Sequence, residues 1–105
     1  NNAGNSGANS IKTIDDVLNS ASNWERLQKG GVMQGWIQGT DARTVFNNMA
    51  AEQGVILSPD QTGFKDSSGN YVGIHDGRVE KNGVTRGLTL DLDFGGQRYK
   101  IGFIP

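Results

Sequence analysis

The stretch LTLDLDFGGQRYKIGF, residues 88–103, decides the fold class that we predict for this chain. Apolar and polar residues alternate on both sides of the two glycines at 95–96, which is the pattern of two half-buried strands. A two-residue Gly-Gly loop between such strands is typical of a type I′ turn, so we predict an antiparallel hairpin. In the register that this loop sets, Asp91 lies opposite Lys100.

The two faces of this hairpin differ in chemistry. Successive side chains of a strand point to opposite faces, so one face is apolar and is expected to pack against helices. The apolar face carries Leu88, Leu90, Leu92, Phe94, Tyr99, Ile101 and Phe103. The polar face carries Thr89, Asp91, Asp93, Arg98 and Lys100. Charge pairs across an exposed hairpin are ordinary and contribute at most about 1 kcal/mol each. The polar face is therefore either a solvated surface or one that presents Lys100 or Arg98 to a phosphate.

The composition of the 105 residues predicts one small domain. Only 34% of the residues are hydrophobic and 16 are glycine, which favours a β-rich fold with many turns. Residues 1–10 are Asn, Gly, Ser and Ala, so we expect a flexible linker there and the domain over 11–105. The chain has no cysteine, which excludes disulfides and thiolate metal sites.

Neither end of the chain predicts a membrane segment. No apolar run approaches the roughly 20 residues that a membrane helix needs. The first residues lack the basic start and the apolar core of a signal peptide, and there is no initiating Met. We therefore expect a domain cut from a longer protein.

Two helices are predicted in the first half of the chain. Thr13 is a suitable N-cap for a helix over 14–28, whose apolar residues recur at helical spacing. Thr40 or Asp41 can cap a second helix, and Gly54 stands where the C′ residue of that helix belongs. Its apolar stripe is Val45, Phe46, Met49 and Ala50.

The remaining segments predict a strand or an extended connection over 32–39 and short strands over 55–57, 63–66 and 71–75. The Asn-Gly signal at 82–83 predicts a turn between 78–80 and 84–86. Together with the last hairpin they give an α+β fold. We expect two N-terminal helices packed on a twisted antiparallel sheet of four to five strands.

The single histidine, His75, ends the stretch YVGIH. Alternation places it on the face opposite Val72 and Ile74, so it shares a side with Lys100 if those two join the core. Histidine is the side chain whose ordinary pKa lies nearest neutral pH. His75 is thus either a proton-handling group or a solvated residue at a strand end.

Other chemistry is weakly indicated. The chain has no P-loop, no histidine pair at metal spacing and no Ser-His-Asp signature. Nothing in the spacing selects for a metal cluster of His75, Asp76, Asp91 and Asp93. Trp24 and Trp36 could stack on bases, but tryptophans at such positions more often pack in the core.

The order of YVGIH, GVTRG, LTLDLDF and YKIGF resembles the C-terminal nuclease domains of bacterial toxins. These are the tips of contact-dependent growth inhibition effectors and related polymorphic toxins. The resemblance covers about residues 11–105 in element order and about 70–103 in residues. It implies the barnase/EndoU/colicin/RelE (BECR) fold.

The resemblance also implies a metal-independent ribonuclease without a cofactor, commonly one that cuts tRNA. In such enzymes a 2′-hydroxyl attacks the adjacent phosphate and leaves a 2′,3′-cyclic end. Carried onto this sequence, His75 is the acid or base and Lys100 stabilises the phosphate. Further implied candidates are Thr85, Arg86 and Thr89 for catalysis, and Arg78 and Arg98 for substrate binding.

The implied partners are tRNA and a cognate immunity protein over the face of His75 and Lys100. The effector would start at a cell surface and deliver the domain to the target-cell cytoplasm. A protein that binds RNA through its overall charge is expected to be positively charged, whereas the net charge of this chain is −1. Some such toxins act on tRNA that is carried by elongation factor Tu. The alternatives are a metal-dependent DNase toxin and a non-enzymatic adhesion or inhibitor module that binds a partner through its hairpin.

Overall fold

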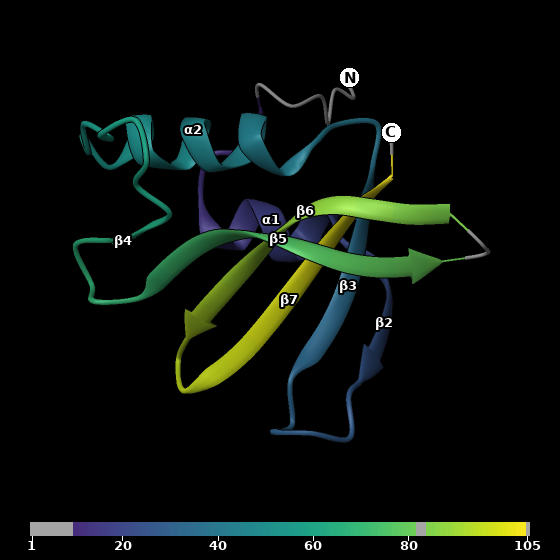
Figure 1. The fold of residues 1–105 in the computed structure, drawn as a ribbon. Coiled ribbons are helices and arrows are strands. Elements are labelled where there is room, and N and C mark those ends of the chain that lie inside the picture. Colours follow the sequence, from purple (N-terminus) through teal and green to yellow (C-terminus); the bar gives the residue numbers. More distant parts are fainter. Residues whose placement is uncertain (1–9, 82–83, 105) are drawn as a thin grey trace.

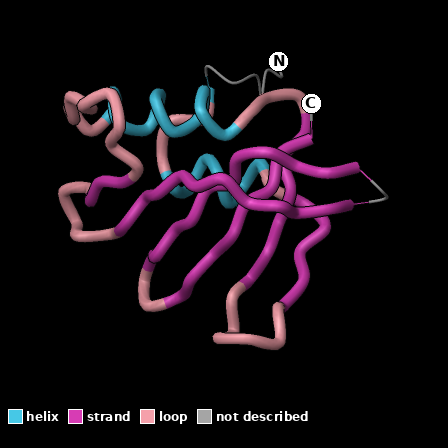
Figure 2. The backbone as a smooth tube through the Cα atoms, viewed as in Figure 1, coloured by secondary structure: helices cyan, strands magenta, loops and turns pink. Residues whose placement is uncertain are grey.

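The structure is a computed structural model that describes residues 10–81 and 84–104, with the side chains of 77–86 left aside. The predicted linker therefore lies, except for Ser10, outside the described residues. The elements are α1 (Ile14–Ser20), β2 (Ser22–Arg26), β3 (Met33–Gln38), α2 (Ala42–Glu52), β4 (Gly63–Lys65), β5 (Tyr71–Lys81), β6 (Val84–Phe94) and β7 (Gln97–Ile104). Figures 1 and 2 show the two helices beside one twisted sheet.

The sheet has six strands in the order β2-β3-β7-β6-β5-β4. Neighbouring strands are antiparallel except β3 and β7, which run parallel. The predicted α+β class is confirmed, but a wholly antiparallel sheet of four to five strands is wrong. The chain passes through α2 and three further strands between β3 and β7, and such a long crossover lets two neighbours run in the same direction. Two strands, β2 and β3, also stand between the helices.

The start of α1 is as predicted and its end is not. Thr13 and Asp16 form a capping box, in which the backbone N–H of Asp16 donates to Thr13 Oγ1 at 3.0 Å. The helix ends at Ser20 rather than at 28, because Ser and Asn around this point compete for backbone hydrogen bonds and are poor helix formers. Asn23 adopts a positive φ of 56° within β2, which pairs with the edge of β3.

Helix α2 confirms its prediction. Asp41 is the N-cap and accepts a hydrogen bond from the Thr44 N–H at 2.8 Å. Gly54 follows the helix with a φ of +71°, a conformation that glycine adopts without a Cβ penalty. The buried stripe is Ala42, Val45, Phe46, Met49 and Ala50.

One hydrophobic core lies between the helices and the sheet, with α1 packed on β3 and α2 on β5 and β6. The strands contribute Ile37, Phe64, Val72, Ile74, Leu90, Leu92, Ile101 and Phe103. Phe94 and Tyr99 are half-buried against this core, as expected. Leu88 was expected to join it and is 37% exposed. The reason is that the β6–β7 pairing ends at Leu90, so Leu88 lies beyond the covered part of the sheet.

The β6–β7 hairpin has the predicted register. Gly95 and Gly96 have φ of +61° and +80°, as a type I′ turn requires. Asp91 is paired with Lys100 and Asp93 with Arg98. The polar face of this hairpin therefore turns away from the core and belongs to the face of the sheet opposite the helices. No helix in the described part of the chain is long and apolar enough to cross a membrane.

Candidate functional site

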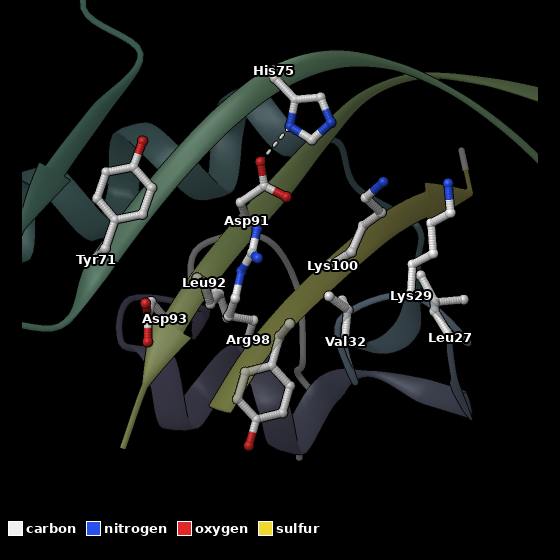
Figure 3. A pocket seen from close by; sticks show the side chains of 11 residues that line it. Leu27, Lys29, Val32, Tyr71, His75, Asp91, Leu92, Asp93, Arg98 and Lys100 are labelled. Atoms are coloured by element: carbon white, nitrogen blue, oxygen red, sulfur yellow. Dashed lines mark ion pairs between the residues drawn. The ribbon is translucent and has the colours of Figure 1, made fainter. Parts of the chain in front are cut away.

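The site lies on the polar, helix-free face of the sheet, which we call the open face. Strand register fixes its centre: Lys100 on β7 is flanked by Gln34 on β3 and by Asp91 on β6. Asp91 is in turn paired with Gly73 on β5, and His75 is paired with Thr89. Val72 and Ile74 are buried, so His75 and Lys100 share this face as the alternation predicted. Figure 3 shows these side chains projecting from β5, β6 and β7.

His75 and Asp91 contact each other across β5 and β6, with Nδ1 and Oδ2 2.5 Å apart, and form an ion pair when the imidazole is protonated. The residue directly opposite Asp91 is Gly73, which has no side chain, so the carboxylate can lean diagonally to the imidazole. Both side chains are accessible, at 38% and 42% of their surface. When Nδ1–H donates to the carboxylate, Nε2 is left as the proton acceptor.

Thr89 lies under the imidazole and is fully buried. Its Oγ1 is 3.0 Å from His75 Nε2 and 3.5 Å from Nδ1. From this buried position the hydroxyl contacts the ring and can hold its orientation, and a catalytic role for Thr89 stays a prediction. Thr89 and Asp91 thus contact the histidine from two sides.

Three cations surround the pair. Lys100, Arg98 and Lys29 line a hollow of about 730 Å³ together with His75 and Asp91. In the described part of the chain the sole ion pair is that of His75 and Asp91. The register predicted that Lys100 faces Asp91, which is confirmed, but the carboxylate turns to the histidine instead. Among the described side chains, Lys100 and Arg98 are therefore not bound to a carboxylate and can face a ligand in the hollow.

Lys29 reaches the open face because the β2–β3 turn is tied down. Leu27 N–H donates to Val32 O at 2.8 Å, and the side chain of Gln97 donates to Gly31 O at 2.8 Å. The second bond fixes the turn to the start of β7, and Figure 3 shows Lys29 beside Lys100. Sequence reasoning missed Lys29 because it assigned this segment to the end of a helix.

Two further residues of the hollow were missed as functional candidates. Asp91 was considered as a partner of Lys100 and as a member of a metal cluster that the spacing does not select, because no local pattern in the sequence reveals that β5 pairs with β6. Tyr71 lies at the start of β5 and is 39% exposed on the same face as His75. The signal for Tyr71 was present in the sequence, since it precedes His75 by four residues in one strand and so shares its face.

The other predicted candidates fall along the distal part of the β5–β6 hairpin. The backbones of Arg78, Thr85 and Arg86 belong to these strands, beyond an irregularity between Asp76 and Val79. Their side chains lie outside the described residues. The described residues of the site on β5 and β6 all lie on the His75 side of that irregularity.

The two tryptophans pack rather than line the hollow. Trp36 is buried, and its ring lies over Gly102, where a Cβ would meet it. Trp24 is 37% exposed at the sheet edge, covers Gly35 and makes an edge contact with Tyr99 at 5.9 Å between centroids. Of the two, only Trp24 has a surface that a ligand could reach.

The acidic residues of the hollow do not converge with the histidine into a metal-ligand group. Among the residues that the structure describes, no three His, Cys, Asp or Glu side chains gather at a distance suited to one ion. Asp76 is exposed and follows His75 directly, so alternation turns it to the other side of the strand.

No protein-family model matches the chain, and no curated protein matches its sequence. The chemistry of the site is therefore inferred from its geometry. An accessible His–Asp pair can accept and return a proton. Cations beside it attract an anion and stabilise charge that develops on it. Together these groups suit proton transfer at a phosphate ester.

Proposed function

We propose that this domain is a metal-independent ribonuclease that cleaves RNA by transesterification. The observation that carries the proposal is the His75–Asp91 pair at 2.5 Å, on an open sheet face beside Lys100. RNA carries a nucleophile of its own in the 2′-hydroxyl, so the protein has to supply only a proton acceptor and cations.

His75 is the proton acceptor in this mechanism. The Thr89 hydroxyl lies 3.0 Å from Nε2 and can donate instead to His75 O, 3.5 Å away, which frees Nε2. Nε2 then takes the proton of the 2′-hydroxyl, and Asp91 stabilises the imidazolium that forms. The 2′ oxygen bonds to phosphorus and the bond to the 5′ oxygen breaks. The imidazolium of His75 then gives its proton to the departing 5′ oxygen, which leaves a 2′,3′-cyclic phosphate and a 5′-hydroxyl and returns His75 to its neutral form.

Lys100 and Arg98 supply positive charge at the phosphate. Negative charge accumulates on the phosphoryl oxygens in the transition state, and a fixed cation favours that state over the ground state. Lys100 is half-buried and stands next to Asp91 in the register, so its strand position brings it close to the His75–Asp91 pair. Arg98 is exposed and suits binding of a neighbouring phosphate.

We further propose that the domain is an antibacterial toxin of the BECR class that acts on tRNA. The support is the resemblance of residues 70–103 to contact-dependent growth inhibition toxins, together with the α+β class of the fold. The parallel β3–β7 pair departs from a purely antiparallel toxin sheet. A cognate immunity protein would cover the open face, and elongation factor Tu could present the tRNA to a chain whose net charge is −1.

The test is incubation of the purified domain with total tRNA, followed by gel analysis and identification of the ends. We expect fragments with 2′,3′-cyclic phosphate ends, the same yield with EDTA, and no cleavage by His75→Ala or Lys100→Ala. Asp76→Ala is the matched control, because it alters the neighbouring residue on the other side of the strand. Cleavage of DNA that EDTA abolishes would replace this proposal with a metal-dependent DNase. Intact RNA and DNA would leave a binding module as the better description.

A further inference from the structure

The ring of Tyr71 lies flat on the open face of the sheet. A Cβ built on Gly63 would lie 2.8 Å from the Cε1 edge of this ring, and one built on Gly73 would lie 2.7 Å from the Cε2 edge. These two glycines are paired across β4 and β5. Because opposite edges of the ring stand over two neighbouring strands, the plane of the ring runs along the sheet. One aromatic face covers the glycines and the other faces outward, with 39% of the residue exposed.

This ring extends toward the proposed catalytic pair. Tyr71 and His75 are four residues apart in one strand, or about 13 Å between Cα atoms at 3.3 Å per residue. The hydroxyl end of the ring reaches Gly73, which is halfway along that span and is itself paired with Asp91. Figure 3 shows Tyr71 and His75 on the same strand, with the imidazole above Asp91 and the ring of Tyr71 to the left of it.

The neighbours of Tyr71 in the register are a cation on one side and an acid on the other. Lys65 on β4 is paired with Tyr71, and so is Asp93 on β6, which is itself paired with Arg98 on β7. Lys65 and Arg98 are both exposed. A flat, outward aromatic surface with one cation beside it, and a second beyond Asp93, suits a planar group that is joined to phosphates.

We propose that Tyr71 is the stacking platform for a nucleobase next to the scissile phosphate, so that the substrate is an RNA strand unpaired at the cleavage point. This inference rests on the proposed ribonuclease function. A base inside a duplex is stacked on both sides and cannot offer its face to the ring, whereas an unpaired base can. Every base has an aromatic face, so the platform selects for strandedness rather than for sequence.

The experiment measures binding of a short, unpaired RNA that contains 2-aminopurine and 2′-O-methyl groups, so that it cannot be cleaved. Stacking quenches the fluorescence of 2-aminopurine. We expect quenching with the wild-type domain and with Tyr71→Phe, and a Kd raised roughly 5- to 150-fold with Tyr71→Leu, which is the range of base–aromatic stacking. The same RNA annealed to its complement is expected to bind more weakly.

Gly73→Ala gives an independent second variant. Its methyl group would occupy the place of the ring, and a ring at the end of a flexible side chain can swing away, so the tyrosine is kept but displaced. We expect the same loss of quenching as in Tyr71→Leu, with a folded circular dichroism spectrum. Trp24→Leu is the matched control, because it removes an exposed aromatic ring that does not itself line the hollow, and this variant should bind as the wild type does.

The outcomes separate this inference from the function on which it rests. Wild-type affinity and quenching in both Tyr71→Leu and Gly73→Ala would overturn the stacking proposal. The ring of Tyr71 would then only cover Gly63 and Gly73, and the proposed ribonuclease function would be unaffected. Quenching that depends on Tyr71 in a domain that cuts no RNA would keep the base subsite and reject the ribonuclease. Equal affinity for single and double strands would overturn the selection for unpaired RNA.

Discussion

The two faces of the sheet are built from the same strands but depend on different interactions. On β6, Leu90 and Leu92 are buried against the helices, while Asp91 between them is 42% accessible on the open face. The stability of the covered face depends on how much apolar surface is removed from water. It therefore depends little on the exact position of single atoms, and the alternation of apolar residues is enough to predict which residues are buried. The open face depends on a few polar atoms held within about 3 Å of each other, the range of a hydrogen bond.

It follows that stability and activity should be separable along a single strand. Truncation of a side chain that faces the core removes packing contacts and leaves the charged groups of the hollow in place. Truncation of a side chain on the open face removes a reactive or charged group and leaves the core intact. Four substitutions test that separation, in order of decreasing expected effect.

His75→Ala should abolish most cleavage and hardly change stability. General acid–base catalysis contributes about 10²- to 10⁴-fold, so kcat should fall by that amount. The side chain is 38% accessible, and its loss should change the free energy of unfolding by no more than about 0.5 kcal/mol. Single-turnover cleavage and urea unfolding check the two halves. Full cleavage by a folded His75→Ala variant would show that the catalytic site does not lie on the open face.

Leu92→Ala should do the reverse. Leu92 is 2% exposed in the core, and a buried leucine truncated to alanine costs about 2–5 kcal/mol of unfolding free energy. Under conditions where the variant is still folded, kcat should stay close to that of the wild type, although Leu92 also borders the hollow. Equilibrium urea unfolding measures the loss. A change in kcat as large as that of His75→Ala would show that the two faces are coupled.

The difference between local pattern and specific contacts also explains which parts of the fold could be predicted from the sequence. Alternation in 88–103 and the Gly-Gly loop fixed the hairpin, its register and its buried leucines, because each depends on local pattern. The end of α1 and the place of β2 could not be predicted, because an edge strand with all five residues exposed carries no apolar periodicity. The parallel β3–β7 pair depends on contacts between segments more than 60 residues apart, for example Gln34 with Lys100.

The candidate site was predicted in part for the same reason. The shared face of His75 and Lys100 follows from alternation in each strand. The turn of Asp91 toward His75, and not toward Lys100, depends on Gly73 opposite it and therefore on the β5–β6 register. Lys29 depends on a hydrogen bond from Gln97 to Gly31 that no local pattern reveals.

Asp91→Asn should lower activity less than His75→Ala. The amide keeps the shape of the side chain but loses the charge that stabilises the imidazolium. A hydrogen bond to a charged group contributes about 1.5–3 kcal/mol, which corresponds to a roughly 10- to 150-fold fall in kcat. A pH–rate profile distinguishes this role from a structural one, because the profile should shift in Asp91→Asn and keep its shape in Asp93→Asn. Identical profiles in all three proteins would mean that Asp91 does not act through His75.

The smallest effect is expected at Asp66, in the turn that joins β4 to β5. Burial raises the pKa of Asp66, but hydrogen bonds from Asn70, Ser68 and Gly69 outweigh it, so the pKa is lowered in the folded protein. Its carboxylate therefore contributes stability that is fully present above the unfolded-state pKa of about 3.9 and is lost as the pH falls through the lower folded value. The contribution should stay below about 1 kcal/mol, because solvent screens a carboxylate this exposed. Urea unfolding between pH 2 and 7 should show a shallower acid loss in Asp66→Asn than in the wild type. Cleavage at pH 7 should be unchanged, because the β4–β5 turn contributes no group to the hollow. A fall in kcat would show that this turn and the open face are not independent.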